Sequence, residues 1–340
     1  MGSEMCIRDR VQETLENSEI PETEEILETS EPSEVEEVSE VPDIIEEIPE
    51  IREGDEDSGE GPVSEAVRSN ERLQQVMKKL KEKTLKPAIH MELNRNPVGL
   101  TDSKLGGIPY LPEAGGVPED GNGHQLRLLA QIRLEDLPEN KLGLPEEGLL
   151  QFWVLDDARI GLETDLDQML LSKGHRVLWY PTVEEGVTEA AVMEKYHFYM
   201  DEESYFPVQD VFGIKFTSAE ESLSYSDYRF QKAFAELWNA EYPSDEIRSY
   251  EALDEEIPDE MMDEIGGSGH KLGGYPMFTQ WDPREGRMEN YEILLLQIDS
   301  FGTGGKEIMW GDSGVGNFFI TPEDLENRDF SKVLYSWDCY

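Results

Sequence analysis

Side chains of the kinds that bind ligands or exchange protons are densest in the last quarter of the sequence. The cluster comprises Trp281, Asp282, Arg284, Gln297, Asp299, Trp310, Asp312, Ser313, Trp337, Asp338 and Cys339. Carboxylates that converge from several loops can bind a hard cation or act as general acid and base. The same aspartates can instead close turns and pair with Arg284, which is their commoner role. A bound ligand would be expected to contact Arg284, Gln297, Asp299, Trp310, Asp312 and Ser313.

No complete catalytic motif accompanies this cluster. Gly311–Gly314 reads GDSG, like the nucleophile loop of trypsin-like proteases, but the matching histidine motif is absent. Val315 stands where a nucleophile elbow needs glycine, and Gly304–Lys306 is not followed by the serine or threonine of a P-loop. The five histidines show no metal-ligand spacing. The sequence therefore predicts no catalytic residue, no bound metal and no cofactor.

The same short sequences occur twice, in the same order and at nearly one offset. KLGGIP at 104–109 recurs as KLGGYP at 271–276, LRLLAQI at 126–132 as EILLLQI at 292–298, and GLLQFWV at 148–154 as GVGNFFI at 314–320. We interpret this as an internal duplication, with pseudo-repeats over about 87–181 and 265–340 joined by 182–264. The offset is much longer than the period of a solenoid, so the pattern predicts two halves that share one core.

The repeated glycines and glutamines have two possible roles. The glycines are expected to form structural turns with positive φ or close backbone approach, at Gly106, Gly107, Gly273 and Gly274. Gln131 and Gln297 stand in otherwise apolar strands, where a buried amide must find hydrogen-bond partners. They either tie down an irregular loop, which we favour, or line a shared cleft as a matched pair.

The elements that must position these residues are mainly β-strands. Short aromatic and β-branched runs predict strands at 87–93, 126–134, 148–155, 176–181, 211–217, 275–279, 291–299, 316–320 and 332–338. Two helices are predicted, over about 69–87 and 227–240, the second with Asp227 as a possible cap and an aromatic stripe facing the core. The predicted fold class is α+β, with an internally duplicated, mostly antiparallel β core and a few flanking helices.

Charge marks a boundary near residue 66. The chain has 340 residues with 76 acidic and 29 basic side chains, a net charge of −47. Residues 11–66 contain one basic residue and no aromatic residue, and we predict a disordered acidic leader. Its alternation of acidic and apolar residues favours a solvating tail, with a docking strip as the alternative. Residues 1–10 differ abruptly in composition and are interpreted as possibly non-native, which leaves 67–340 as the folded domain.

The composition also limits the partners and the compartment. A chain this acidic repels nucleic acids and anionic membrane surfaces, so neither is an expected partner. Two cysteines at opposite ends define no disulfide framework, which favours the cytoplasm. The lysines at 78, 79, 81, 83 and 86 end the first predicted helix. They are interpreted as a solvated face, with an interaction surface as the alternative.

Several motifs carry a resemblance to a known family. KLGGIPYLP, LPEEGLLQFWV, HKLGGYPMFTQWDPR, LLLQIDS, MWGDSGVGNFFI and LYSWDC follow one another in the chain. Over about residues 85–340 the chain resembles the YwqG-like family, also called domain of unknown function 1963. This resemblance implies a cytosolic bacterial α+β domain with a duplicated β core, and it implies no chemistry. The acidic leader and the stretch near 245–262 depart from the family layout.

Two functions follow as hypotheses. The first is a non-catalytic binding or interaction module for a protein or small ligand, in its specific form an immunity-type protein that neutralises a toxin. It rests on the acidic charge and the incomplete catalytic motifs. The second is a hydrolase or metal-assisted enzyme that uses Asp282, Asp299 and Asp312. We favour the first, and the sequence predicts no oligomeric state.

Overall fold

The structure is a computed structural model that describes residues 65–139, 141–163, 173–199, 204–253, 257, 262 and 265–340. The first ten residues and the predicted acidic leader lie outside these ranges, except that residues 65 and 66 belong to the first helix. Most of residues 254–264 in the acidic stretch before the second Gly-Gly turn also lie outside them.

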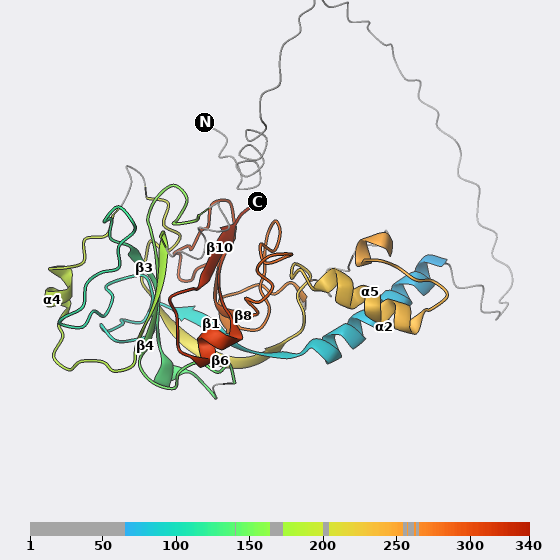
Figure 1. Cartoon of the computed structure of the whole chain (residues 1–340), viewed down its shortest axis with the longest axis horizontal. Helices are drawn as coiled ribbons and strands as arrows, with labels where there is room; N and C mark the ends of the chain where they lie inside the picture. Colours follow the sequence, from blue (N-terminus) through green and yellow to red (C-terminus); the bar gives the residue numbers. More distant parts are fainter. Residues whose placement is uncertain are drawn as a thin grey trace, which may run out of the picture.

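A ten-stranded sheet forms the body of the molecule (Figure 1). Its strands are β1 (Lys86–Asn94), β2 (Lys104–Leu105), β3 (Arg127–Arg133), β4 (Leu149–Val154), β5 (His175–Tyr180), β6 (Phe212–Glu221), β7 (Lys271–Gly273), β8 (Ile293–Asp299), β9 (Val315–Ile320) and β10 (Leu334–Asp338). They lie in the order β10-β9-β8-β7-β1-β6-β2-β3-β4-β5, and the neighbours pair antiparallel. The predicted mostly antiparallel β core is confirmed.

One predicted strand, 275–279, is wrong. The second Gly-Gly turn is preceded by the short strand β7, and residues 275–279 form no strand. Their backbone N–H groups donate to side chains instead of a neighbouring strand: Met277 to Gln297 at 2.8 Å and Thr279 to Asp338 at 3.0 Å. These residues therefore form a loop in spite of their apolar composition, because side chains satisfy their backbone groups.

Along the chain the strands form two runs of five, β1–β5 and β6–β10, which exchange their first strands within the sheet. Strands β2 to β5 lie side by side at one end of the sheet and β7 to β10 at the other. The central strands β1 and β6 pair with each other, and each also pairs with a short strand of the opposite run, β1 with β7 and β6 with β2. The two runs are joined into one sheet by this exchange.

The sheet curls into a near-barrel whose outer hairpins meet. The rings of Phe152 on β4 and Phe318 on β9 have centroids 5.1 Å apart. His175 Nε2 on β5 lies 2.8 Å from the carbonyl oxygen of Val333, next to β10. The interior that this curl encloses is a single large cluster of buried aliphatic and aromatic residues from both runs.

Two helices form a lobe beside the sheet, α2 (Glu65–Thr84) and α5 (Phe230–Glu241) (Figure 1). Their apolar stripes pack together and bury Leu73, Val76, Leu80, Phe230, Phe234 and Trp238. The expectation that Asp227 caps α5 is wrong: the capping position is Arg229, with no side-chain cap. The shorter elements α4 (Glu189–Met193), α7 (Pro322–Glu326), η1 (Leu134–Asp136) and η2 (Tyr250–Leu253) lie between strands.

Candidate functional site

A buried glutamine holds the second Gly-Gly turn. The side chain of Gln297 on β8 is fully buried, and its Oε1 accepts a hydrogen bond from the Met277 amide at 2.8 Å. Its Nε2 donates to the carbonyl oxygens of Gly267 and Gly269, each at 2.8 Å. Both amide hydrogens are therefore used on the chain before the turn, and the amide oxygen holds the chain after it.

Gln131 on β3 makes the same set of contacts in the first half. Its Oε1 accepts from the Tyr110 amide at 2.9 Å, and its Nε2 donates to the carbonyl oxygens of Leu100 at 3.0 Å and Asp102 at 2.9 Å. Each of these residues stands 166 or 167 positions before its counterpart around Gln297. The two glutamines thus perform one structural task twice.

A second amide supports each turn from the next strand. Gln151 on β4 donates to the Tyr110 carbonyl oxygen at 2.7 Å, and Asn317 on β9 donates to the Met277 carbonyl oxygen at 2.8 Å. The signal for this pair was present in the sequence, because Gln151 and Asn317 occupy the same position of the aligned blocks GLLQFWV and GVGNFFI. The sequence reasoning did not use it.

All four glycines of the two turns have positive φ. The values are 66° and 77° at Gly106 and Gly107, and 69° and 68° at Gly273 and Gly274. Gly106 also lies close to another backbone segment, because a Cβ placed there would be 2.6 Å from the Asp210 carbonyl oxygen. These positions need glycine for both conformation and space.

The lysine that begins each motif is buried but is neutralised differently. Lys271 Nζ pairs with Glu221 Oε2 at 2.7 Å, whereas Lys104 Nζ donates to the carbonyl oxygens of Gly99 at 2.9 Å and Leu100 at 3.0 Å. Burial lowers the pKa of Lys104 to about 8. Burial would raise the pKa of Glu221, but His90 and Lys271 hold it below its usual value. Lys271 also donates to the Gly267 carbonyl oxygen at 2.7 Å, as Lys104 does to that of Leu100, so the two sites differ in the ion pair with Glu221.

Asp299 and His270 close the loop beside Gln297. Asp299 Oδ2 accepts from the Gly269 amide and its Oδ1 from the Ser300 amide, each at 2.7 Å. His270 Nδ1 accepts from the Asp299 amide at 3.0 Å, so its Nε2 donates to the Phe301 carbonyl oxygen at 3.0 Å. Burial lowers the pKa of His270 to about 4, which keeps the ring neutral at pH 7.

Arg284 lies in a second, separate cluster between the helical lobe and the sheet. It is almost fully buried, and it binds Asp282 through Nε at 2.9 Å and Nη2 at 2.6 Å. The same Nη2 donates to Asp227 Oδ2 at 2.9 Å, and Asp227 also binds Arg229 through two side-chain hydrogen bonds. Burial would raise the pKa of Asp227, but the two arginines hold it below its usual value.

Lys86 adds a cation to the edge of this cluster. Its Nζ donates to the Glu292 carbonyl oxygen at 3.1 Å and lies 5.3 Å from the centre of the Tyr275 ring. Burial, assisted by the charge of Arg229, lowers the pKa of Lys86 to about 8. The cluster therefore joins helix α5 to the sheet through charges that largely cancel.

The third location is the loop 309–314 before β9. Trp310 is fully buried, and its backbone N–H donates to Ser300 Oγ at 2.9 Å. Asp312 and Ser313 are exposed at the tip of this loop, and the Asp312 carbonyl oxygen accepts from the Tyr340 amide at 3.2 Å. The loop is thereby fixed to the residues that follow β10.

The six expected ligand contacts are thus distributed over three places. Gln297 and Asp299 share Gly269, Arg284 is in the ion-pair cluster, and Trp310, Asp312 and Ser313 share the 309–314 loop. Within the described ranges, no three His, Cys, Asp or Glu side chains are grouped so that they could hold a metal ion. Each of the three places is held together by contacts within the chain.

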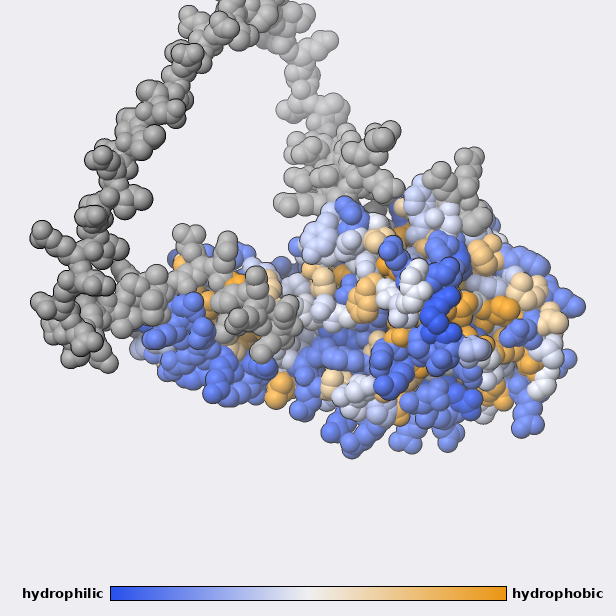
Figure 2. Space-filling model, turned by 180° about the vertical axis from the view of Figure 1, so that it is seen from behind, coloured by the Kyte–Doolittle hydropathy of each residue, from blue (hydrophilic) through white to orange (hydrophobic). Residues whose placement is uncertain are grey.

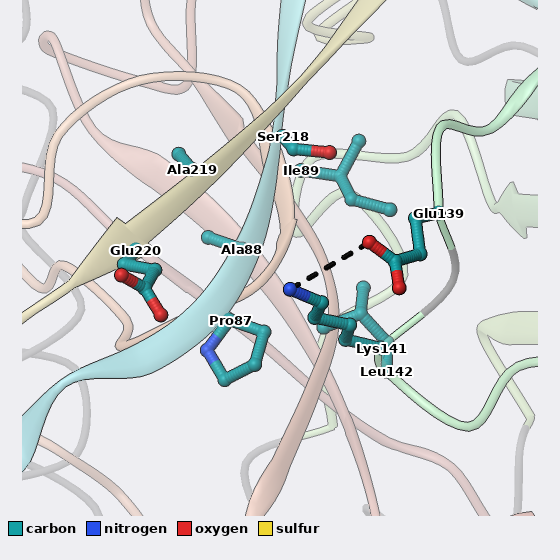
Figure 3. A pocket seen from close by; sticks show the side chains of 9 residues that line it. All are labelled: Pro87, Ala88, Ile89, Glu139, Lys141, Leu142, Ser218, Ala219 and Glu220. Carbon is teal, nitrogen blue, oxygen red and sulfur yellow. Dashed lines mark ion pairs between the residues drawn. The ribbon is translucent and has the colours of Figure 1, made fainter.

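A pocket of about 310 Å³ lies between strands β1 and β6 and the loop before β4 (Figure 3). It is lined by Pro87, Ala88, Ile89, Glu139, Lys141, Leu142, Ser218, Ala219 and Glu220. The charged groups lie at its edge, where Lys141 Nζ is 3.7 Å from Glu139 Oε2, and both side chains are largely exposed. The lining contains no histidine, cysteine or aspartate, and it includes none of the six expected contacts.

A family model for a domain of unknown function, DUF1963, matches residues 103–339. The chain belongs to the DUF1963 family. A search of curated proteins found no match. The DUF1963 match includes both Gly-Gly turns and both glutamines, whereas two backbone partners of Gln131, Leu100 and Asp102, precede residue 103. Strand β1 and helix α2 precede residue 103, although β1 lies at the centre of the DUF1963 sheet.

The sequence analysis of this DUF1963 protein did not predict the buried contacts of two aspartates, Asp227 and Asp338. Asp227 was expected to cap a helix, but it binds two arginines, one of them 57 positions away. Asp338 on β10 accepts from the amides of Thr279 at 3.0 Å and Gln280 at 2.8 Å, and burial raises its pKa to about 6. These are long-range contacts for which the sequence carries no local signal.

Among the described residues, no helix is both long and apolar enough to span a bilayer.

Proposed function

We propose that this DUF1963 protein is a non-catalytic binding module that binds a basic protein through the exposed loops of its second half. The observation that carries the proposal is a group of large exposed side chains on three loops. Trp281 is 50% exposed, Met309 40% and Tyr340 69%. Aromatic and methionine side chains of this kind are the usual anchors of protein interfaces.

Backbone and side-chain contacts bring these three loops together. Gln280, next to Trp281, donates through Nε2 to the Cys339 carbonyl oxygen at 2.5 Å. Tyr340 donates its N–H to the Asp312 carbonyl oxygen, which joins the loop of Met309 to the same edge. We call Trp281, Met309, Asp312, Ser313 and Tyr340 the loop face. Asp312 and Ser313 are its polar contacts, while buried Arg284, Gln297, Asp299 and Trp310 support the loops.

The charge of the chain determines the kind of partner. A net charge of −47 attracts a basic surface and accelerates its association at low ionic strength. In its most specific form the proposal is an immunity-type role, in which the loop face covers and neutralises a basic toxin. We place the protein in the cytoplasm, which is supported by only two cysteines in 340 residues.

The contacts of the aspartates support binding over hydrolysis. An enzyme that used Asp282, Asp299 and Asp312 would need their carboxylates at one point. Asp282 is instead engaged with Arg284, and Asp299 with two backbone amides of its own loop. Removing these contacts for catalysis would leave a buried charge without a partner.

We also infer that β1–β5 and β6–β10 descend from one duplicated unit. The matching contacts of Gln131 and Gln297 support this inference, as do those of Gln151 and Asn317. The equivalent strand orders on the two sides of β1 and β6 support it as well. In such a molecule one half can keep the scaffold while the loops of the other acquire binding residues.

The binding proposal is tested with the immobilised full-length protein and a cell extract, with bound proteins identified by mass spectrometry. We expect basic proteins that are retained at low salt and lost at high salt, and a loss of at least about tenfold for Trp281→Ala/Tyr340→Ala. Met193→Ala is the matched control, because Met193 is 46% exposed on α4 outside the loop face. Equal retention by all three proteins, or hydrolysis that depends on Asp312, would contradict the proposal.

A further inference from the structure

Helix α2 carries a groove that the loop face does not involve. The groove has a volume of about 380 Å³ and is lined by Gln74, Met77, Lys78, Lys81, Glu82, Leu85 and Ile265. The six residues from α2 and its end each have a neighbour three or four positions away in this set, so they form one stripe along the helix. This stripe is different from the one that contacts α5, with which it shares only Met77.

The groove combines an apolar floor with an edge on which two lysines outnumber one acidic residue, Glu82. Met77 and Ile265 are buried at its base, and Leu85 at its end remains 49% exposed. Lys78 and Lys81 stand beside them, and Lys83 is exposed on the same last turns of the helix. Figure 2 shows mainly hydrophilic residues over the helical lobe, with hydrophobic residues between them. Such a groove fits a segment with apolar residues spaced between acidic ones.

We propose that the groove on α2 binds the chain's own acidic leader through residues 41–51. This segment reads VPDIIEEIPEI, with five apolar residues between four acidic ones. Its isoleucines match the floor formed by Met77 and Ile265, and its carboxylates match Lys78 and Lys81. The segment itself lies outside the described residues, and the inference rests on the groove and on this complementarity.

The tether makes the leader the favoured occupant. Residue 51 is 14 positions before the start of α2 at Glu65, a span of up to about 46 Å in an extended chain. The groove lies about 14–30 Å along the helix from that start, at 1.5 Å per residue. The leader can therefore fold back to reach every part of the groove. A tether of this length gives an effective concentration near the millimolar range, which a separate acidic protein would have to exceed.

The test is carbodiimide cross-linking of the full-length protein, which joins a lysine amine to a carboxylate only when the two are in contact. We expect links from Lys78 or Lys81 to Glu46, Glu47 or Glu50 within single chains. The variant Ile44→Ser/Ile45→Ser/Ile48→Ser keeps every charge, and we expect it to lower these links at least about fivefold because the apolar contacts are lost. Leu85→Ser in the groove should act in the same direction.

The matched control is Ile20→Ser/Ile26→Ser/Leu27→Ser, which makes three equivalent changes elsewhere in the leader. We expect it to leave the links unchanged, and equal melting temperatures will show that every variant is folded. Links that neither triple variant changes would mean diffuse charge attraction and would overturn the proposal. It would also be overturned by links between chains in a mixture of isotope-labelled and unlabelled protein, or by links from residues 254–264 in place of the leader.

Discussion

At the scale of single residues, Arg284 and Lys104 show two ways in which this protein accommodates a buried charge. Arg284 makes two side-chain hydrogen bonds to Asp282 and a third to Asp227. Burial alone would lower its pKa, but these carboxylates hold it above the usual value. Lys104 contacts only carbonyl dipoles, and burial lowers its pKa to about 8. For Arg284 the carboxylate partners outweigh the effect of burial on the pKa, whereas the carbonyl groups around Lys104 do not.

Asp338 is expected to make the stability depend on pH. Burial raises its pKa to about 6 in the folded protein, against about 3.9 in an unfolded chain. Between these values the folded state binds more protons than the unfolded state, so the free energy of unfolding decreases as the pH rises from 4 to 6. Asp338→Asn keeps an oxygen for the amides of Thr279 and Gln280 and should remove about 2–3 kcal/mol of this decrease.

Urea unfolding at several pH values between 4 and 7 measures this difference. Asp312→Asn, at an exposed position, serves as the control and should follow the wild-type profile. Parallel profiles for the wild type and Asp338→Asn would show that the buried carboxylate is ionised throughout, against the prediction.

At the scale of elements, the sequence predicts the long strands because the burial of each strand is reflected in the composition of its own residues. Strands such as β4 and β9 bury every residue, and a six-residue run that is apolar except for one amide is typical of that environment. Strands β2 and β7 have two and three residues, which is too short for any periodicity. Residues 275–279 have the composition of a strand, but the groups that bind their backbone come from β8 and β10.

In the candidate site, too, contacts between residues close in sequence could be predicted and contacts between distant segments could not. The pairing of Asp282 with Arg284 joins residues two positions apart, and the sequence analysis included it as an alternative. The contact of Arg284 with Asp227 joins two distant segments, the residues before α5 and the loop between β7 and β8, and only the tertiary fold brings them together. The structural role of the two glutamines could be predicted from the repeat, because Gln131 and Gln297 occupy matching positions in the two halves.

The Gly-Gly turn offers a comparison that separates strain from crowding. Gly106 and Gly305 have similar φ values of 66° and 73°, but only Gly106 is close to another segment, the Asp210 carbonyl oxygen. Alanine at either position should cost about 1–2 kcal/mol for the left-handed conformation. Gly106→Ala should cost about 2 kcal/mol more, because a Cβ there would lie 2.6 Å from that oxygen. Urea unfolding of both variants checks this, and equal losses would mean that the turn moves freely away from Asp210.

At the scale of the whole molecule, charge and surface are unevenly distributed. The proposed loop face lies on the second half of the sheet, whereas the basic groove lies on the helical lobe formed by α2 and α5. A tether that holds the acidic leader on the lobe would keep part of the negative charge away from the loop face. A basic partner would then meet the loop face directly, and the two proposals can be tested independently because they concern different surfaces.

The exchange of central strands makes β1 part of the folding unit, although it precedes the family region at 103–339. All nine residues of β1 pair with β6, and three of them also pair with β7. Without β1, both of these strands would expose an unpaired edge in the middle of the sheet, and the loss of α2 would uncover the aromatic stripe of α5.

We expect a chain that begins at residue 65 to melt cooperatively within a few degrees of the full-length protein, because the leader adds only its docking contacts. A chain that begins at residue 103 should fail to fold, as measured by near-ultraviolet circular dichroism and thermal melting. A cooperative transition in the shorter chain at an unchanged temperature would show that β1 is dispensable, and a drop of many degrees in the longer one would show that the leader packs far more extensively than the groove on α2 allows.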